Sequence, residues 1–74
     1  MTDKQQKTLA LRKMGMKIRS WRTIKSMTQE QLAEATNLSP RLIRYYEAGQ
    51  RQAPTAVLCS IANALDTRIS DLLP

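Results

Sequence analysis

The 74-residue sequence lacks histidine and has a single cysteine, Cys59. One cysteine cannot form an internal disulfide, and without histidine the chain has no set of nitrogen and sulfur ligands suited to zinc. We therefore expect no metal and no cofactor. Catalysis is also unsupported, because the sequence has no histidine base, no glycine-rich phosphate loop and no carboxylates paired by their spacing. The sequence predicts a binding protein and not an enzyme.

Long apolar runs are also missing. No stretch of about eighteen apolar residues is present, and no apolar block stands between a basic start and a small-residue cleavage site. The sequence therefore predicts no membrane partner and a cytoplasmic location, close to the nucleoid. Its length leaves room for one domain, near the lower limit at which a single apolar core holds a fold.

Acidic residues are absent from a long N-terminal stretch, between Asp3 and Glu30, and the net charge is +6. The basic residues of that stretch are Lys4, Lys7, Arg12, Lys13, Lys17, Arg19, Arg22 and Lys25. Such asymmetry favours a polyanionic partner, because a protein that neutralises phosphates releases their counterions. Around Lys13, Lys17 and Arg19 a solvated helix face is the favoured interpretation, and added phosphate contacts are the alternative.

What is present is helical periodicity. Residues 1–8 are polar and lack an apolar period, so we predict a flexible N-terminal arm over 1–10 and a folded domain over 11–74. Apolar side chains then recur at steps of three and four, which predicts a helix over residues 11–25 with one face on the core. These side chains are Leu11, Met14, Ile18 and Trp21.

Two short helices follow, each with a hydroxyl residue at its start. Thr28 and Gln31 have the spacing of a capping box, which predicts a helix over 29–36. Ser39 precedes Pro40, a proline suited to the first helical position, and predicts a second helix over 40–48. Gly49 is placed to end that helix in the left-handed conformation.

The rest of the chain predicts two more helices, so the fold class is all-α with five helices. Thr55 is the expected cap of a helix over 56–65, and a short final helix is expected over 70–73. Cys59 lies beside the apolar positions of the fourth helix. We expect it to be a small buried side chain and not a redox sensor.

Several motifs at matching spacings resemble those of the phage repressor and Cro-type helix-turn-helix family. They are Thr28-Gln29-Glu30-Gln31-Leu32-Ala33-Glu34, Leu38-Ser39, Ile43-Arg44-Tyr45-Tyr46-Glu47-Ala48-Gly49, Pro54 and Ile61-Ala62-Asn63-Ala64-Leu65. The resemblance implies a lambda-repressor-like DNA-binding domain of prokaryotic or phage type. It also implies a transcription regulator, commonly a repressor, that binds double-stranded operator DNA as a homodimer with the helix at 40–48 in the major groove.

The helical period gives that third helix two faces. Ile43 and Tyr46 lie one turn apart and are expected to pack inward. The side chains expected to read bases lie on the other face: Pro40, Arg41, Arg44 and Tyr45. Arg41 can donate two parallel hydrogen bonds to a guanine, and Arg44 can do the same or hold a phosphate. Tyr45 can contact a thymine methyl or a phosphate. Pro40 departs from the family, since several phage repressors have a glutamine there and proline has no donor.

Phosphate contacts are implied by the resemblance at two further places. Gln29 matches the glutamine that opens the second helix of the family and contacts a phosphate. The loop after the third helix lies along the sugar-phosphate backbone in the family, which implies contacts from Arg51 and Thr55, with Gln50 beside them. Arg22 and Glu47 match a structural salt bridge that fixes the angle of the recognition helix.

Two alternatives remain open. The same fold can serve as a protein-interaction module, for example an antitoxin-like partner, although the basic recognition face argues against that function. The domain can also bind DNA nonspecifically, as architectural proteins do.

Overall fold

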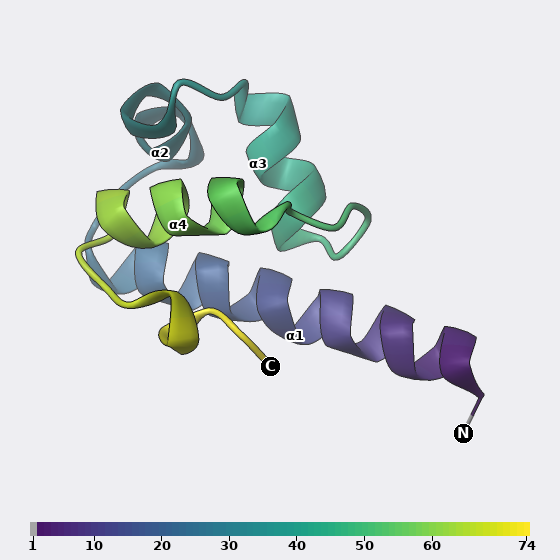
Figure 1. Ribbon diagram of the computed structural model, residues 1–74. Helices are drawn as coiled ribbons and strands as arrows, with labels where there is room; N and C mark the ends of the chain where they lie inside the picture. Colours follow the sequence, from purple (N-terminus) through teal and green to yellow (C-terminus); the bar gives the residue numbers. More distant parts are fainter. Residues whose placement is uncertain (1) are drawn as a thin grey trace.

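The computed structural model describes residues 2–74, and within them it has four α-helices, one 3-10 turn and no strand. The elements are α1 (Asp3–Ile24), α2 (Gln29–Thr36), α3 (Pro40–Glu47), α4 (Thr55–Ala64) and η1 (Ile69–Asp71). In Figure 1, α2, α3 and α4 gather on one side of α1, and the C-terminal segment returns toward α1. The prediction of five α-helices is corrected, because the last one, expected over 70–73, is the 3-10 turn η1.

The first helix is longer than its apolar period indicates. It begins at Asp3 and not at residue 11, so the stretch predicted as a flexible arm is helical as far as it is described. Thr2 and Gln5 form a capping box at its start, and the segment that follows has strong helix formers and no glycine or proline before Gly15. A cap and good propensity therefore extend the helix where no apolar face requires it. Met1 lies outside the described residues.

The two short helices have the expected starts. Thr28 accepts a hydrogen bond from the Gln31 amide, and Ser39 accepts one from the Leu42 amide. Pro40 is the first residue of α3, which ends at Glu47, one residue before the predicted end, with Ala48 as its C-cap. The turn between the helices is made by Asn37, whose φ of 58° is left-handed. Asparagine tolerates that conformation better than most residues.

The fourth helix starts differently from the prediction. Pro54 is its N-cap residue and Thr55 is already its first helical residue, so the Thr55 hydroxyl caps nothing. Proline fixes the backbone at the helix entry and no side-chain hydrogen bond is needed there. The loop before it is anchored by Ala53, which is buried.

The core is formed where the three shorter helices meet α1. Its largest fully buried side chains come from all four helices and from the segment after α4. They are Ile18, Leu32, Ile43, Ile61, Leu65 and Leu72. Cys59 is exposed, which corrects the expectation of a buried side chain, because it lies on the outer face of α4 beside Leu58 and not on the core stripe. None of the helices in residues 2–74 is both long and apolar enough to span a membrane.

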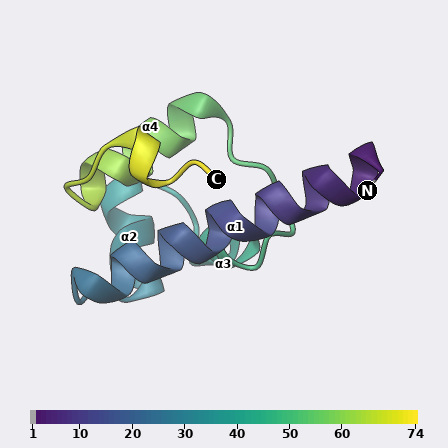
Figure 2. The ribbon, with the colours of Figure 1, turned by 90° about the horizontal axis from the view of Figure 1, so that it is seen from below.

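Seen from below, α1 crosses the whole molecule, and its N-terminal half extends past the other helices (Figure 2). Twenty-two residues of α-helix measure about 33 Å at 1.5 Å per residue, which accounts for most of the 36 Å long axis. The long first helix therefore sets the shape of the protein.

Candidate nucleic-acid interface

The C-terminal end of α3 rests directly on the backbone of α1. The contact point is Gly15, which is buried; a Cβ atom there would lie 2.4 Å from the carbonyl oxygen of Tyr46 and 2.5 Å from that of Glu47. Such distances are far below van der Waals contact, so only glycine allows this approach. Gly15 thereby fixes how closely α3 sits on α1.

An ion pair holds the same end of α3 in orientation. Arg22 Nε donates to Glu47 Oε2 at 2.6 Å, and Arg22 Nη2 donates to Glu47 Oε1 at 3.0 Å. Arg22 Nη1 also donates to the carbonyl of Met27, at 2.9 Å. The side chains are 14% and 4% exposed, so water screens the pair little. The hydrogen bond to Glu47 raises the pKa of Arg22 above its ordinary value.

Gln29 joins this pair from the start of α2. Its Nε2 donates to Glu47 Oε1 at 3.1 Å. The Glu47 carboxylate of α3 therefore accepts hydrogen bonds from Arg22 of α1 and from Gln29 of α2. The first two amides of α2, those of Gln29 and Glu30, have no partner inside the helix. They give the start of α2 the partial positive charge that favours an anion.

The outer face of α3 presents a cluster of two guanidinium groups on one aromatic ring. Arg41 Nε donates to the Tyr45 hydroxyl at 3.0 Å, and the Arg41 guanidinium carbon lies 5.6 Å from the ring centroid. Arg51, in the loop after α3, lies 5.8 Å from the same centroid. Both distances are within the range of a cation–π interaction. Among residues 2–74, neither arginine is in an ion pair, so the cluster keeps two positive charges.

Arg44 lies on another side of the helix. It borders a hollow of about 650 Å³ together with Arg19, Thr28, Gln29 and Glu30. Its only ion pair among the described residues is a 4.0 Å contact with Glu30, and both side chains are more than half exposed, so this contact holds Arg44 weakly. The hollow therefore combines the start of α2, whose first amides are free, with the cations Arg19 and Arg44, and the carboxylates of Glu30 and Glu47 also line it.

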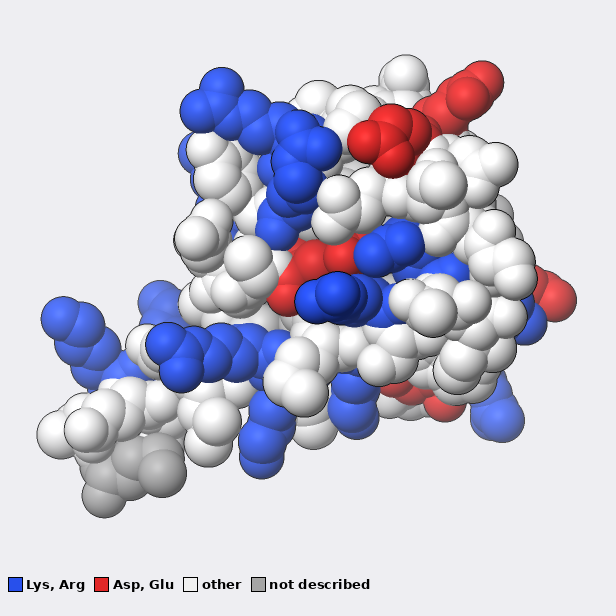
Figure 3. Space-filling model, turned by 180° about the vertical axis from the view of Figure 1, so that it is seen from behind, with Lys and Arg blue, Asp and Glu red and all other residues white. Residues whose placement is uncertain are grey.

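Figure 3 shows the distribution of charge on this side of the molecule. A group of acidic atoms at the centre is flanked by basic side chains, and more basic side chains lie at the upper left. The end of the chain that projects at the lower left carries basic and no acidic side chains on the face seen. Other acidic side chains lie at the upper right, at the right edge and along the bottom, so the left side of this face is the more basic one.

Not every predicted contact residue joins these groups. Pro40 is half-buried and offers no donor. Gln50 is exposed, and its backbone amide donates to the carbonyl of Tyr45, at 2.9 Å. Thr55 is exposed and borders a different hollow, shared with Lys7 and the C-terminal Leu73. Thr55 is therefore separated from the cluster on Tyr45.

Two features of the site have no clear signal in the sequence. Gly15 lies inside a helical pattern, where a glycine alone does not tell which backbone approaches it. Arg19 resembles any solvated basic residue, and only the fold brings it beside Gln29 and Arg44. Both depend on how α1 packs against the two short helices.

Comparisons with known proteins agree with this arrangement. The helix-turn-helix family model matches residues 18–72. The control protein C.SmaI of Serratia marcescens is 38% identical over 56 residues, which are 76% of this chain and 67% of that protein.

Solved structures give the same match. The restriction-modification controller protein C.AhdI from Aeromonas hydrophila superposes with a TM-score of 0.83 at 33% identity, and covers 85% of this chain and 96% of its own. The clp gene regulator ClgR from Corynebacterium glutamicum has a TM-score of 0.80 at 33% identity, with 84% of this chain and 81% of its own covered.

Proposed function

The chain belongs to the helix-turn-helix family of DNA-binding transcription regulators, and from that membership we propose that it holds operator DNA with α3 in the major groove. One observation carries the proposal: the guanidinium groups of Arg41 in α3 and Arg51 in the loop after it lie at the outer face of α3, with no ion pair among residues 2–74, while the inner face and C-terminal end of the helix are fixed to the core. A rigid helix with free forked donors has what base recognition in a groove requires.

Arg41 is the proposed base reader. Its Nε is occupied by the Tyr45 hydroxyl, which leaves both terminal nitrogens free to donate to one acceptor pair. Guanine offers such a pair, O6 and N7, in the major groove. The Tyr45 hydroxyl then positions Arg41, and the edge of the Tyr45 ring contacts the groove. Pro40 adds an apolar contact, because it has no donor. A guanine in each half-site is the expected preference.

Phosphates are proposed to bind on both sides of this helix. The hollow at the start of α2 offers two free amides and the cations Arg44 and Arg19, which favours a phosphate there and a phosphate role for Arg44. Gln29 is fixed by Glu47 and has a second amide hydrogen left for the same phosphate. Arg51 faces the opposite strand, with Gln50 and Thr55 as further contacts along the loop.

Two copies are proposed to bind one operator. A single short recognition helix contacts few base pairs, and a two-fold dimer places two of them about 34 Å apart in successive major grooves. Repression by occupying the operator is the proposed mode of action.

The test is selection of bound duplexes from a random pool, followed by titration of the selected duplex across a salt series. We expect a two-fold symmetric sequence with guanine in each half-site, and affinity that falls steeply with salt because phosphates are neutralised. A protein-interaction module would bind no duplex even at low salt. Architectural binding would give the same affinity for selected and random duplexes.

A further inference from the structure

The N-terminal half of α1 lies outside the part of the chain that the family model matches. That match begins at residue 18, whereas α1 begins at Asp3. Every residue from Thr2 to Leu9 is exposed, so hydrophobic burial does not explain why this segment continues as a helix beyond the body of the protein. This projecting N-terminal half of α1, residues 3–13, is called the rod below.

The charge of this rod is strongly positive. Lys4, Lys7, Arg12 and Lys13 are all exposed, and Asp3 is the single acidic residue of the segment. None of these cations is in an ion pair within residues 2–74. Exposed cations without acidic neighbours give this part of the surface a positive field, which attracts an anionic partner.

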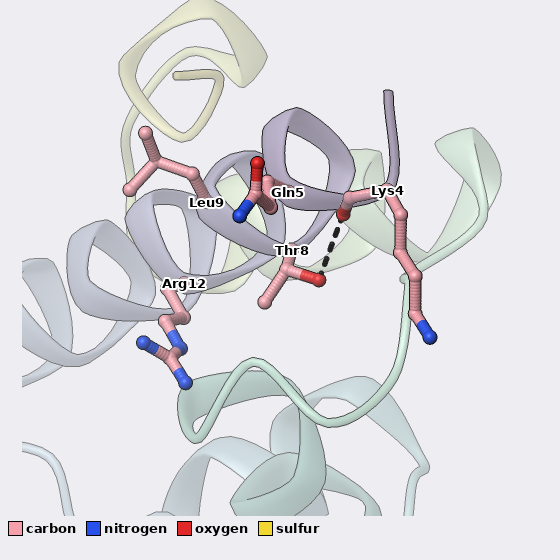
Figure 4. A pocket seen from close by; sticks show the side chains of 5 residues that line it. All are labelled: Lys4, Gln5, Thr8, Leu9 and Arg12. Atoms are coloured by element: carbon pink, nitrogen blue, oxygen red, sulfur yellow. Dashed lines mark hydrogen bonds between the residues drawn. The ribbon is translucent and has the colours of Figure 1, made fainter. Parts of the chain in front are cut away.

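Two of the cations lie on the same side of the rod. Lys4 and Arg12 border an open hollow with Gln5, Thr8 and Leu9. Figure 4 shows the Lys4 and Arg12 side chains directed to the same side of α1, with Thr8 between them. The Thr8 hydroxyl donates to the carbonyl of Lys4 at 3.0 Å, so its hydrogen is already used. The two cations and the Gln5 side-chain amide are the free donors of this hollow, and only the cations carry charge.

This side of α1 borders the loop that follows α3. A Cβ atom on Gly49 would lie 2.9 Å from the Cα atom of Arg12, so the loop backbone rests against α1 at that residue. Gly49 has a φ of 71° and is followed closely by Arg51, a proposed phosphate contact. The loop passes beneath Arg12 and toward Lys4 in Figure 4. The basic side of the rod therefore continues the edge of the proposed interface.

We propose that Lys4 and Arg12 bind DNA phosphates beyond the half-site contacted by α3, so that the projecting half of α1 lengthens the footprint on the duplex. The inference rests on the proposed function and adds a surface to it. Their Cα atoms are separated by about 12 Å along the helix, at 1.5 Å per residue. Phosphates of one strand follow at about 3.4 Å along the axis, so the two cations contact separate phosphates.

The test compares the double variant Lys4→Gln/Arg12→Gln with wild type on the selected duplex across a salt series. Each lost phosphate contact reduces the slope of log affinity against log salt by about 0.9, so the variant slope is shallower by about 1.8 for each bound copy and by about 3.6 for an operator that holds two copies. By the same relation, the ratio of wild-type to variant affinity falls by roughly tenfold for each bound copy when salt rises fourfold. The loss is equal for selected and random duplexes, because phosphates carry no sequence information.

A matched control removes the same charge from another side of α1. Lys13 and Lys17 border a hollow beside Pro74, and Lys17 Nζ also donates to the carbonyl of Leu73 at 2.6 Å. Lys13→Gln/Lys17→Gln should leave the slope close to the wild-type value, and its unfolding midpoint is measured alongside. Lys4 lies far from the core, so the single variant Lys4→Gln should not disturb folding. It should reduce the slope by about half as much as the double variant does. Nested duplexes with growing flanks supply a second readout: wild type gains affinity with flank length, and the double variant reaches its plateau earlier.

The outcomes separate the two proposals. If the double variant has the slope of the control, or if wild-type affinity does not change with flank length, Lys4 and Arg12 do not bind phosphates. Recognition by α3 is unaffected by that result. A wild type that binds no duplex at any salt concentration overturns both.

Discussion

Two sides of α3 differ in how they are held, although the helix has only eight residues. Its inner face and C-terminal end are fixed: Tyr46 is buried, Glu47 is paired with Arg22, and the backbone rests on Gly15. Its outer face carries Arg41, which is exposed and has no carboxylate partner among residues 2–74.

The difference separates stability from recognition along one helix. A change at the fixed end should unfold the protein and weaken the binding of every DNA sequence together. A change on the exposed outer face should leave the free energy of unfolding unaltered and act on particular base pairs. Each of the following variants tests one side of that separation, beginning with the largest expected effect.

Glu47→Ala should break the fixed end most severely. It leaves the Arg22 guanidinium nearly buried without a counter-charge and frees the Gln29 amide, and loss of one partner from such a pair costs about 3–5 kcal/mol. Urea unfolding followed by circular dichroism measures the loss. Glu34→Ala, an exposed carboxylate on α2, is the control and should change little. Equal midpoints for the two variants would show that the ion pair does not hold α3.

Gly15→Ala should also destabilise the fixed end, by less. A methyl group in the helix interior normally gains up to about 1 kcal/mol over glycine, but here it collides with two carbonyl oxygens of α3, and overpacking costs about 1–3 kcal/mol. We expect a lower thermal midpoint than wild type. Ser20→Ala on the exposed side of α1 should not lower it. A more stable Gly15→Ala protein would mean that α3 does not rest on α1 as described.

Arg41→Ala tests the exposed outer face of α3. The side chain is exposed, so unfolding should stay within about 0.5 kcal/mol of wild type, while discrimination at one base position falls by about 1–3 kcal/mol. Fluorescence anisotropy with duplexes substituted at each position measures it. Arg68→Ala, an exposed arginine at the start of the last turn, is the matched charge control. A uniform loss across all duplexes would reduce Arg41 to a phosphate contact.

Tyr45→Phe should have the smallest effect. It keeps the ring beneath Arg41 and Arg51 and removes the hydroxyl that accepts from Arg41 Nε, a hydrogen bond worth about 0.5–1.5 kcal/mol. The expected result is weaker discrimination at the Arg41 position. Tyr45→Leu, which removes the ring as well, should lose more. If Tyr45→Phe instead weakens all duplexes equally, the hydroxyl contacts a phosphate and not Arg41.

Local signals in the sequence predicted the helix-turn-helix well. Thr28, Ser39 and Pro40 start the two short helices where the caps indicated, because a cap acts within a few residues of itself. The early start of α1 was missed, since the prediction followed apolar periodicity and gave no weight to the Thr2 cap. Helix α4 was displaced by one residue because Pro54 replaced a hydroxyl cap.

Contacts between distant segments were harder to predict. The family resemblance supplied the pairing of Arg22 with Glu47, but no local pattern places Arg51 on the ring of Tyr45, because that contact depends on the path of the loop after Gly49. The closeness of Gly15 to α3 depends on helix packing in the same way. Such features follow from the assembled fold and not from any window of sequence.

The proposed function depends most directly on contact between the outer face of α3 and DNA. Amide shift mapping by NMR, with the labelled protein titrated by the selected duplex, tests it in one experiment. We predict the largest shifts at Gln29, Arg41, Arg44, Tyr45 and Arg51, with small shifts on the outer face of α4 around Cys59. Shifts concentrated on α4 and the C-terminal segment, with α3 unchanged, would contradict it.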